Sequence, residues 1–182
     1  MARVPYLEVS DLSDDNKDLL KRPIWLTKAL VNSPNAARAM APLGQYIRYG
    51  SKLDSRLREL AILQVGWLAS SPYEWSHHVK LGLGFGVTEA DVQALIDDTD
   101  GKPTSLDAIT RLVLRAAREM TTGGEMTEAT FKAVQDAWGN ELAVDLTLTI
   151  GFYNAVVRIL GTLKIDVEPE YQPYLDKFPL RA

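Results

Sequence analysis

Residues 54–70 of the chain read DSRLRELAILQVGWLAS. From Leu60 to Ala69 this stretch is apolar almost all round, and only Gln64 and Gly66 interrupt it. A helix with apolar side chains on most of its faces is buried on most of its sides. We therefore expect residues 54–70 to form a central helix around which the rest of the fold packs.

The segments that follow this helix also show helical signals. Ser71-Pro72 opens a helix that ends near Gly86, because proline favours the first helical position and glycine the position after the last turn. Apolar residues recur at helical spacing after Ser105, and in the helix expected at 141–161 residues 142–160 are again apolar nearly all round. No run alternates as a strand does. The sequence predicts an all-α fold of about seven or eight helices.

Length and composition indicate one globular domain. The chain has 182 residues, of which 46% are hydrophobic and 24% charged. These values are typical of a folded domain with its own core. We expect a single domain over residues 1–182, with a core at about 24–165, an N-terminal extension at 1–23 and an extended tail at 166–182. That tail is rich in proline and is expected to lie over the body of the protein or over a neighbour.

Composition excludes several classes of function. The chain contains no cysteine, which removes disulfides, thiolate metal sites and cysteine nucleophiles. Its net charge is -4 and no basic cluster occurs, so we expect no nucleic-acid partner. Residues 142–160 have about the length of a membrane span, but Asp145 and Arg158 lie within them, which favours a core or interface helix. We expect no membrane partner, no signal segment and a cytoplasmic location.

The two histidines of the chain are adjacent, at His77 and His78. Neighbouring residues on a helix are about 100° apart, so we expect one of them to face inward and the other outward. Glu74 is one turn before His78 and Gly82 one turn after it. This spacing predicts an acid–base pair at the wall of a small pocket, in which Gly82 leaves open space. His78 is therefore the expected inward histidine and His77 the more exposed one.

A structural role for Glu74 is an equally good interpretation. Ser71-x-x-Glu74 has the spacing of a capping box, in which the glutamate only bonds the first amide of its helix. Likewise, either histidine could be a solvent-facing or hydrogen-bonded structural residue. We expect no metal, since Glu74 and one histidine supply two ligands and the sequence places no third. We also expect no organic cofactor, because the glycine-rich stretch 82–86 ends a helix instead of opening one.

Other candidates lie on the central helix and on the long helix. Glu59 precedes the most apolar part of its helix, and an inward carboxyl there would be suited to proton transfer; a surface ion pair with Arg56 or Arg58 is the alternative. The residues considered for substrate binding are polar or aromatic groups near these positions. They are Tyr73, Trp75, Gly82, Tyr153, Asn154 and Arg158. For Trp75 packing in the core is the alternative, and for Asn154 and Arg158 pairing across a subunit interface.

Two stretches resemble the motifs of a known family. Residues 53–63, LDSRLRELAIL, and residues 71–78, SPYEWSHH, followed by Gly86-Val87-Thr88, are similar to the two motifs of the carboxymuconolactone decarboxylase-like family, which includes the AhpD alkylhydroperoxidases. The resemblance implies an AhpD-like helical bundle. In the peroxidase branch the second motif carries Cys-x-x-Cys and then a histidine. Here Ser71 and Glu74 occupy the cysteine positions and His78 matches the histidine.

The resemblance also implies a function. Glu59 matches a glutamate of the family's proton relay, so the chain has the relay without the thiols and cannot reduce peroxides through them. The decarboxylase branch uses neither cysteines nor a cofactor. We therefore expect a cofactor-free enzyme that acts on a small carboxylated or lactone-type molecule of aromatic catabolism, by proton transfer at His78 with Glu59 and Glu74. The alternatives are an isomerase, lactone hydrolase or dehydratase, and a non-catalytic ligand-binding or structural oligomer.

The apolar helices further predict self-association. One domain of this size can bury few helices that are apolar on every side, so a leftover face should meet another subunit. The resemblance implies a trimer or a hexamer, and we expect a homo-oligomer built from dimers. The alternative is that segments between Ser13 and Arg48 cover these faces within one chain.

Overall fold

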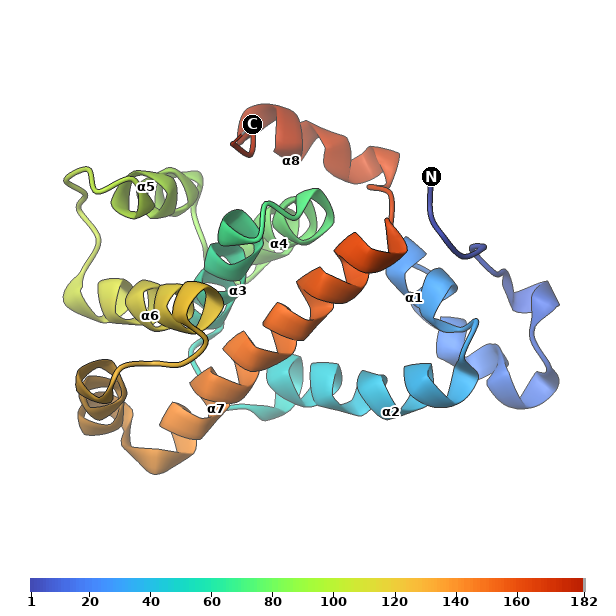
Figure 1. Ribbon diagram of the computed structural model, residues 1–182, viewed down its shortest axis with the longest axis horizontal. Coiled ribbons are helices and arrows are strands. Elements are labelled where there is room, and N and C mark those ends of the chain that lie inside the picture. The colour runs from blue at the N-terminus through green and yellow to red at the C-terminus, as the bar shows by residue number, and fades with distance from the viewer. Residues whose placement is uncertain (182) are drawn as a thin grey trace.

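The computed structural model describes residues 1–181, and Figure 1 shows their arrangement. Within this range the protein has eight α-helices and no strand, as the sequence predicts. The helices are α1 (Trp25–Leu30), α2 (Pro34–Gln45), α3 (Ser55–Leu68), α4 (Pro72–Gly84), α5 (Glu89–Thr99), α6 (Ala108–Arg118), α7 (Glu128–Leu163) and α8 (Gln172–Lys177). Short 3₁₀ turns lie at Val9–Asp11, Asp14–Leu20 and Pro169–Tyr171, and π turns follow α2 at Tyr46–Gly50 and α6 at Glu119–Gly123.

Helix α3 is the centre of the fold. Every residue from Leu57 to Trp67 is buried, and α3 packs against α4, α5, α6 and α7. One face joins a core with α6 and α7 through Ile62 and Val65, and the opposite face joins a second core with α4 and α5 through Leu63. The prediction of a central helix buried on most sides is therefore confirmed.

Helix α7 is the longest element and crosses the molecule diagonally in Figure 1. It consists of two helices joined at Gly139, whose φ of 76° is readily adopted only by glycine. By length and composition α7 could cross a membrane. Its buried side chains, however, complete the core beside α3, with Leu146 and Ile150 at 0% exposure. This is the behaviour of a core helix.

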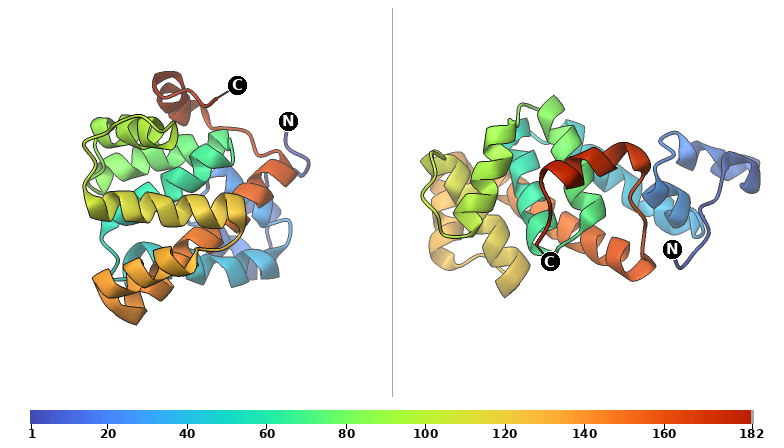
Figure 2. Two further views of the ribbon diagram at one scale, coloured as in Figure 1. Left: turned by 60° about the vertical axis from the view of Figure 1, so that its left-hand side comes forward. Right: turned by 90° about the horizontal axis from the view of Figure 1, so that it is seen from above.

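The N-terminal segments lie together at one end of the molecule, as the right-hand view of Figure 2 shows. Their own small core contains Leu12, Leu20, Val31 and Ala37. The π turn that follows α2 is anchored to α7, because Tyr46 Oη and Ser51 Oγ donate to the two oxygens of Asp145 at 2.8 and 2.6 Å. Residues 1–50 thus cover one side of α4 and α7, where the cavity described below is found.

The C-terminal tail does not have the extended form that we expected. It folds into a 3₁₀ turn and α8, and it packs against α4. Tyr171 and Phe178 are buried, and the Phe178 carbonyl accepts a 2.8 Å hydrogen bond from Trp75 Nε1. These two aromatic side chains anchor the tail to the body of the protein. The sequence of the tail shows no helical periodicity, so this packing was not predicted.

Candidate functional site

Helices α3 and α4 approach closely, and two glycines make that approach possible. A Cβ atom on Gly66 of α3 would lie 3.3 Å from the Trp75 backbone nitrogen, and one on Gly82 of α4 would lie 3.2 Å from Val87 Cγ2 and 3.6 Å from Glu59 Cβ. Gly82 therefore leaves no open space, and that expectation was wrong. Its role is to let α4 lie against α3, which brings Glu59 and His78 together.

His78 lies between two carboxylates. Its Nδ1 is 2.7 Å from Glu59 Oε2, and its Nε2 is 3.0 Å from Glu74 Oε1. All three side chains are buried, with exposures of 1 to 4%. The second contact is an ion pair without the alignment of a hydrogen bond, since Glu74 Oε1 has no hydrogen-bond partner in the described part of the chain. Glu74 Oε1 can therefore accept a further hydrogen bond.

The two carboxylates determine the charge of His78. Burial alone would lower its pKa, but Glu74 and Glu59 together raise that pKa to about 9. His78 is therefore an imidazolium at neutral pH. Burial would in turn raise the pKa of Glu59, but His78 and Arg58 outweigh burial and lower it. The cluster consequently holds an ionised carboxylate and a protonated imidazole side by side.

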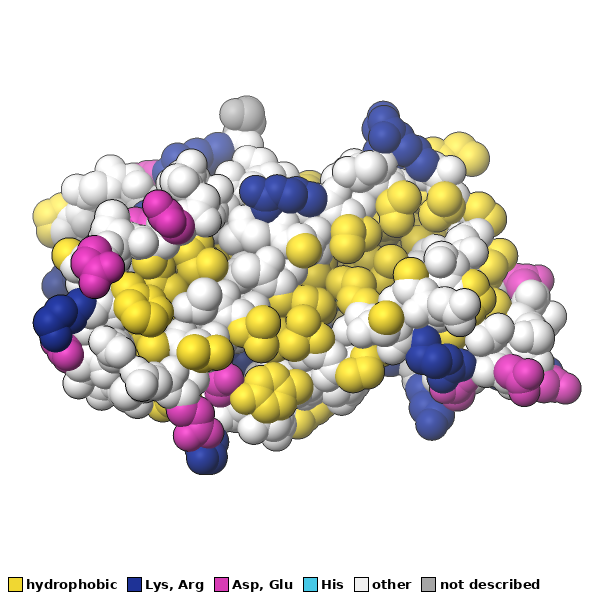
Figure 3. Space-filling model, turned by 60° about the horizontal axis from the view of Figure 1, so that its bottom comes forward, with side chains coloured by type: hydrophobic (Ala, Val, Ile, Leu, Met, Phe, Trp, Pro, Cys, Tyr) yellow, Lys and Arg dark blue, Asp and Glu magenta, His cyan; other side chains and the backbone are white. Residues whose placement is uncertain are grey.

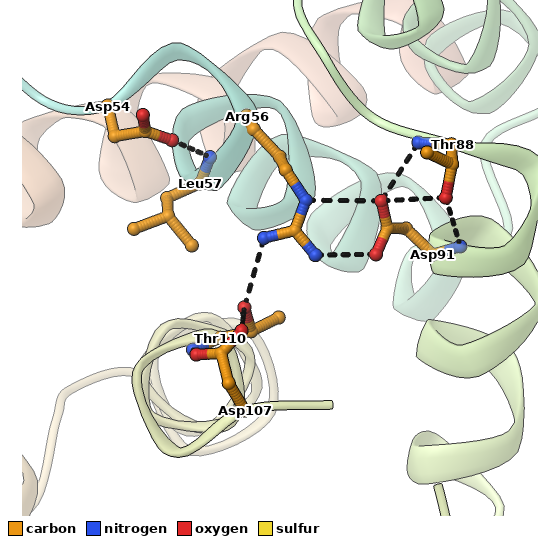
Figure 4. Close-up of polar contacts among 7 residues, drawn as sticks. All are labelled: Asp54, Arg56, Leu57, Thr88, Asp91, Asp107 and Thr110. Carbon is orange, nitrogen blue, oxygen red and sulfur yellow. Dashed lines mark hydrogen bonds and ion pairs between the residues drawn. The ribbon is translucent and has the colours of Figure 1, made fainter. Parts of the chain in front are cut away.

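Arg58 is the fourth charged residue of this cluster. Its Nε and Nη2 lie 3.1 and 3.0 Å from Glu59 Oε1, and both side chains are buried. The alternative of a surface ion pair for Glu59 is therefore wrong. Arg56 takes a different partner: its Nε donates to Asp91 at 3.1 Å and its Nη1 to Thr110 Oγ1 at 3.2 Å, which ties α3 to α5 and α6 (Figure 4).

Glu74 is not engaged in a capping box. Ser71 precedes α4, but its side chain accepts no hydrogen bond from the first turn. The Glu74 side chain instead turns toward His78, one helical turn away. Of the two interpretations that the sequence left open, the structure thus favours the acid–base pair.

The expectation that His77 would be the exposed histidine was wrong. His77 is 3% exposed and His78 is 4% exposed. The C-terminal tail covers His77: its Nε2 lies 2.8 Å from Glu168 Oε2, and its ring is stacked between Tyr73 and Tyr171 at 4.0 and 3.5 Å. Burial lowers the pKa of His77 despite the opposing effect of Glu168, so this histidine is neutral at pH 7.

A cavity of about 500 Å³ opens beside the cluster, between α1, α2, α4 and α7. Its inner wall carries six polar or aromatic side chains. They are Arg48, Tyr73, Glu74, His77, His78 and Tyr153. The opposite wall is mostly apolar and is formed by residues of α1 and α2. Among them are Leu26, Leu30 and Met40. Glu59 and Arg58 do not line the cavity. Glu59 contacts His78 and helps to keep it protonated, and Arg58 contacts Glu59.

Four of the residues considered for substrate binding do not line this cavity. Trp75 is fully buried against Trp67, as the core alternative predicts, and Gly82 lies at the crossing of α3 and α4. Asn154 bonds Thr121, and Arg158 is exposed and bonds Asn154. Tyr73 and Tyr153, in contrast, do line the cavity.

Sequence reasoning missed three residues of the site. Glu168 receives hydrogen bonds from Tyr73 Oη and the Trp25 amide at 3.1 and 2.7 Å and holds His77 in place. Arg48 lines the cavity from the π turn after α2. Arg58 was considered only as a surface partner. Nothing local in the sequence distinguishes Glu168 or Arg48, because their neighbours in space are far away in the chain.

The site does not present a metal-binding set. Among residues 1–181, no group of three or more histidine, aspartate or glutamate side chains is arranged to hold a metal ion. Each nitrogen of His78 already faces a carboxylate. The arrangement instead presents a protonated imidazole at a cavity wall, a group that is chemically able to donate a proton.

The fold and the site together define a class: an all-helical protein with a buried Glu–His–Glu cluster at a cavity. The model of the carboxymuconolactone decarboxylase family matches residues 34–119, which include Glu59, Glu74 and His78. The solved structures below have the same architecture. The chain thus matches the carboxymuconolactone decarboxylase family model over residues 34–119, has an AhpD-like fold, and lacks the Cys-x-x-Cys pair.

Two solved structures are similar over nearly the whole chain. One is the AhpD core of an uncharacterized peroxidase-related protein from Ralstonia eutropha JMP134, with a TM-score of 0.75, 19% identity, and coverage of 96% of this chain and 95% of that chain. The other is a cysteine-to-alanine variant of the debrominase Bmp8 in complex with 2,3,4-tribromopyrrole, with a TM-score of 0.79, 16% identity, and 97% coverage of each chain. At these identities the likeness concerns the fold. No curated protein matches the chain.

Proposed function

We propose that the protein is a cofactor-free enzyme that acts on a small carboxylated or lactone-type organic molecule by proton transfer. The observation that carries this proposal is the position of His78, which is clamped between Glu59 and Glu74 at the wall of the cavity. A protonated imidazole held by two carboxylates in a buried site is a proton donor with a fixed orientation. The cavity volume suits a substrate of about drug size or smaller.

Decarboxylation makes a modest demand on such a site. When the substrate carboxylate leaves as CO₂, the electron pair of the broken bond passes into the conjugated lactone. The resulting anion is then protonated at carbon. The proton comes from the His78 imidazolium. Its Nε2 lies 3.0 Å from Glu74 Oε1, and substrate binding aligns this pair so that Glu74 passes the proton on to carbon. Glu59 and Arg58 hold the imidazole in place, and solvent restores the proton afterwards.

A second reaction class uses the same groups. The debrominase Bmp8 has a similar fold and was solved with a five-membered aromatic ring bound, which favours a small ring as substrate here too. Isomerisation, lactone hydrolysis or dehydration of such a ring would also need a proton donor and an acceptor at adjacent atoms. A thiol mechanism does not apply, since the chain has no cysteine.

The test is a substrate screen with purified protein. Carboxylated butenolides and related ring-cleavage products are incubated with the wild type, and CO₂ release and ring ultraviolet absorbance are recorded. His78→Gln should lower turnover at least about 100-fold, the lower end of the usual contribution of a general acid. Arg158→Gln removes an exposed charge outside the cavity and should leave turnover unchanged.

The outcomes separate the reaction classes. CO₂ release that depends on His78 supports the decarboxylase. A change in absorbance without CO₂ that still depends on His78 points to the second class. Ligand binding without any turnover points to a non-catalytic binding protein.

We also propose that the chain forms a homo-oligomer. Hydrophobic side chains gather on the face turned forward in Figure 3. An apolar groove is lined by residues of α2, α7 and the segments between α6 and α7. They are Leu43, Met120, Phe131, Val144, Thr147, Leu148, Gly151 and Phe152. Val144 is 59% exposed, which is unusual for a valine on a helix of the core, and a second copy of the chain would cover it.

A further inference from the structure

At the inner end of the cavity most charged side chains have a partner, but Arg48 forms no ion pair within residues 1–181. In the cluster described above, Arg58 and the His78 imidazolium offset Glu59 and Glu74, so the four charges cancel. Glu168 lies behind the His77 ring and accepts hydrogen bonds from three donors. Of the cations on the cavity wall, only Arg48 is both half-buried and free of any ion pair within residues 1–181.

The other cations of the cavity lie at its outer rim. Arg38 is exposed and forms an ion pair with Asp18 at 2.9 Å. Lys21 and Arg22 are exposed as well, where water screens their charge. A charge at the rim can attract an anion but does not fix its position. Arg48 differs because its surroundings exclude part of the water.

The backbone that carries Arg48 is held from two sides. Its carbonyl accepts a 3.1 Å hydrogen bond from Arg58 Nη1, the same arginine that binds Glu59. Ile47 beside it is 1% exposed, and Tyr46 is bonded to Asp145 of α7. A π turn fixed in this way presents its side chain in a defined direction, and such turns are frequent at functional sites.

Tyr153 connects Arg48 with the acid–base cluster. Its ring packs edge-on against the His78 ring at 5.0 Å. Tyr153 lines the same cavity as Arg48. The positive charge of Arg48 partly offsets the rise that burial causes in the pKa of this tyrosine. Because that pKa stays raised, the hydroxyl keeps its proton at neutral pH and can donate it in a hydrogen bond.

We propose that Arg48 and the Tyr153 hydroxyl together bind a carboxylate of the substrate that is retained throughout the reaction. A guanidinium is suited to this, because its planar fork matches the two carboxylate oxygens. A carboxylate stabilised by Arg48 resists loss of CO₂, so the bound group is not the one that leaves. Binding at Arg48 instead places the reacting carbon near Glu74 and His78. The statement that a carboxylate binds at Arg48 does not depend on the proposed function. Only the statement that this carboxylate is retained during the reaction rests on it.

The test compares two small probes that differ in charge. Binding of 2-furoate and of its neutral amide, 2-furamide, to the full-length protein is measured by isothermal titration calorimetry at pH 7.5. The wild type should bind 2-furoate at least about tenfold more tightly, the factor expected for one charged hydrogen-bonded contact. Arg48→Gln should remove this preference and leave the affinity for 2-furamide unchanged. Arg48→Lys should retain a reduced preference, since it keeps the charge and loses the fork.

Arg158→Gln is the matched control, since it removes an exposed arginine that also forms no ion pair in the described residues and should preserve the preference. Equal binding of the two probes to the wild type, or no binding of 2-furoate at roughly 10 mM, would overturn the inference. So would an Arg48→Gln protein that still prefers the anion. If the preference depends on Arg48 but no substrate is turned over, the anion site stands and the proposed reaction fails.

Discussion

The substitution Glu59→Gln tests the electrostatic description of the cluster most directly. In the folded protein the pKa of His78 is about 9, against 6.5 for an unperturbed histidine. A raised folded-state pKa means that the folded protein binds the proton more tightly than the unfolded chain. The resulting stabilisation is fully present below pH 6.5 and is lost as the pH rises through 9. At about 1.4 kcal/mol per pKa unit, it amounts to about 3 kcal/mol.

Glu59→Gln keeps the shape of the side chain and removes its charge. His78 and Arg58 then lose the carboxylate that lies between them. Breaking a buried ion pair by removing one partner costs about 3 to 5 kcal/mol, and we expect a loss of this size at pH 6. The pKa of His78 should fall, because burial disfavours its charged form. The variant's stability should therefore change much less between pH 6.5 and 9.

The assay is urea unfolding followed by tryptophan fluorescence at several pH values from 6 to 9, together with an NMR titration of the histidine ring protons. His77, the other histidine, has a pKa lowered from 6.5, so its contribution to the pH dependence of stability lies below pH 6.5 and has the opposite sign. Glu170→Gln, which removes an exposed carboxylate, should leave both curves unchanged. Wild-type stability that is flat from pH 6.5 to 9, or a His78 that titrates near 6.5, would refute the reasoning.

Four further outcomes are expected. His78→Ala should abolish turnover and His77→Ala should affect it only mildly, as steady-state kinetics on any substrate found would show; equal effects would contradict separate roles. Glu168→Ala should cost about 3 kcal/mol of unfolding free energy in urea, because it leaves three donors without their acceptor. Gly82→Ala should cost about 1 to 3 kcal/mol, since its Cβ would press on a side chain at 3.2 Å; an unchanged unfolding midpoint would argue for open space after all. Val144→Asp should reduce the mass found by light scattering, whereas a wild-type mass near 20.2 kDa would rule out the oligomer.

Local chemistry was sufficient to predict much of the fold. The part of the stretch from Leu60 to Ala69 is apolar almost all round, which predicts a buried helix, and α3 is the centre of the structure. Helix α4 begins at Pro72 and ends at Gly84, close to the limits that proline and glycine predicted. These features depend on residues within one or two turns of each other, which is the range over which sequence patterns carry information.

Part of the site could be predicted in the same way. Glu74 and His78 are one turn apart on a single helix, so their pairing follows from helical geometry. For Glu59, which precedes the apolar run of α3, an inward carboxyl and a surface ion pair were both considered. Its contact with His78 depends on the crossing of α3 and α4, which the sequence indicated only through the family resemblance.

The sequence by itself thus determined the helices, the central position of α3, the absence of thiol chemistry and the Glu74–His78 pair. Only the tertiary structure decided that His77 is buried, because Glu168 and Tyr171, about ninety residues further along the chain, cover it. Only the tertiary structure placed Arg48 in the cavity, whose inner wall includes residues of α4 and α7 and whose apolar wall comes from α1 and α2. The physical reason is that helical periodicity specifies which face of a helix is apolar, whereas the segment that covers this face is selected by packing across the whole chain.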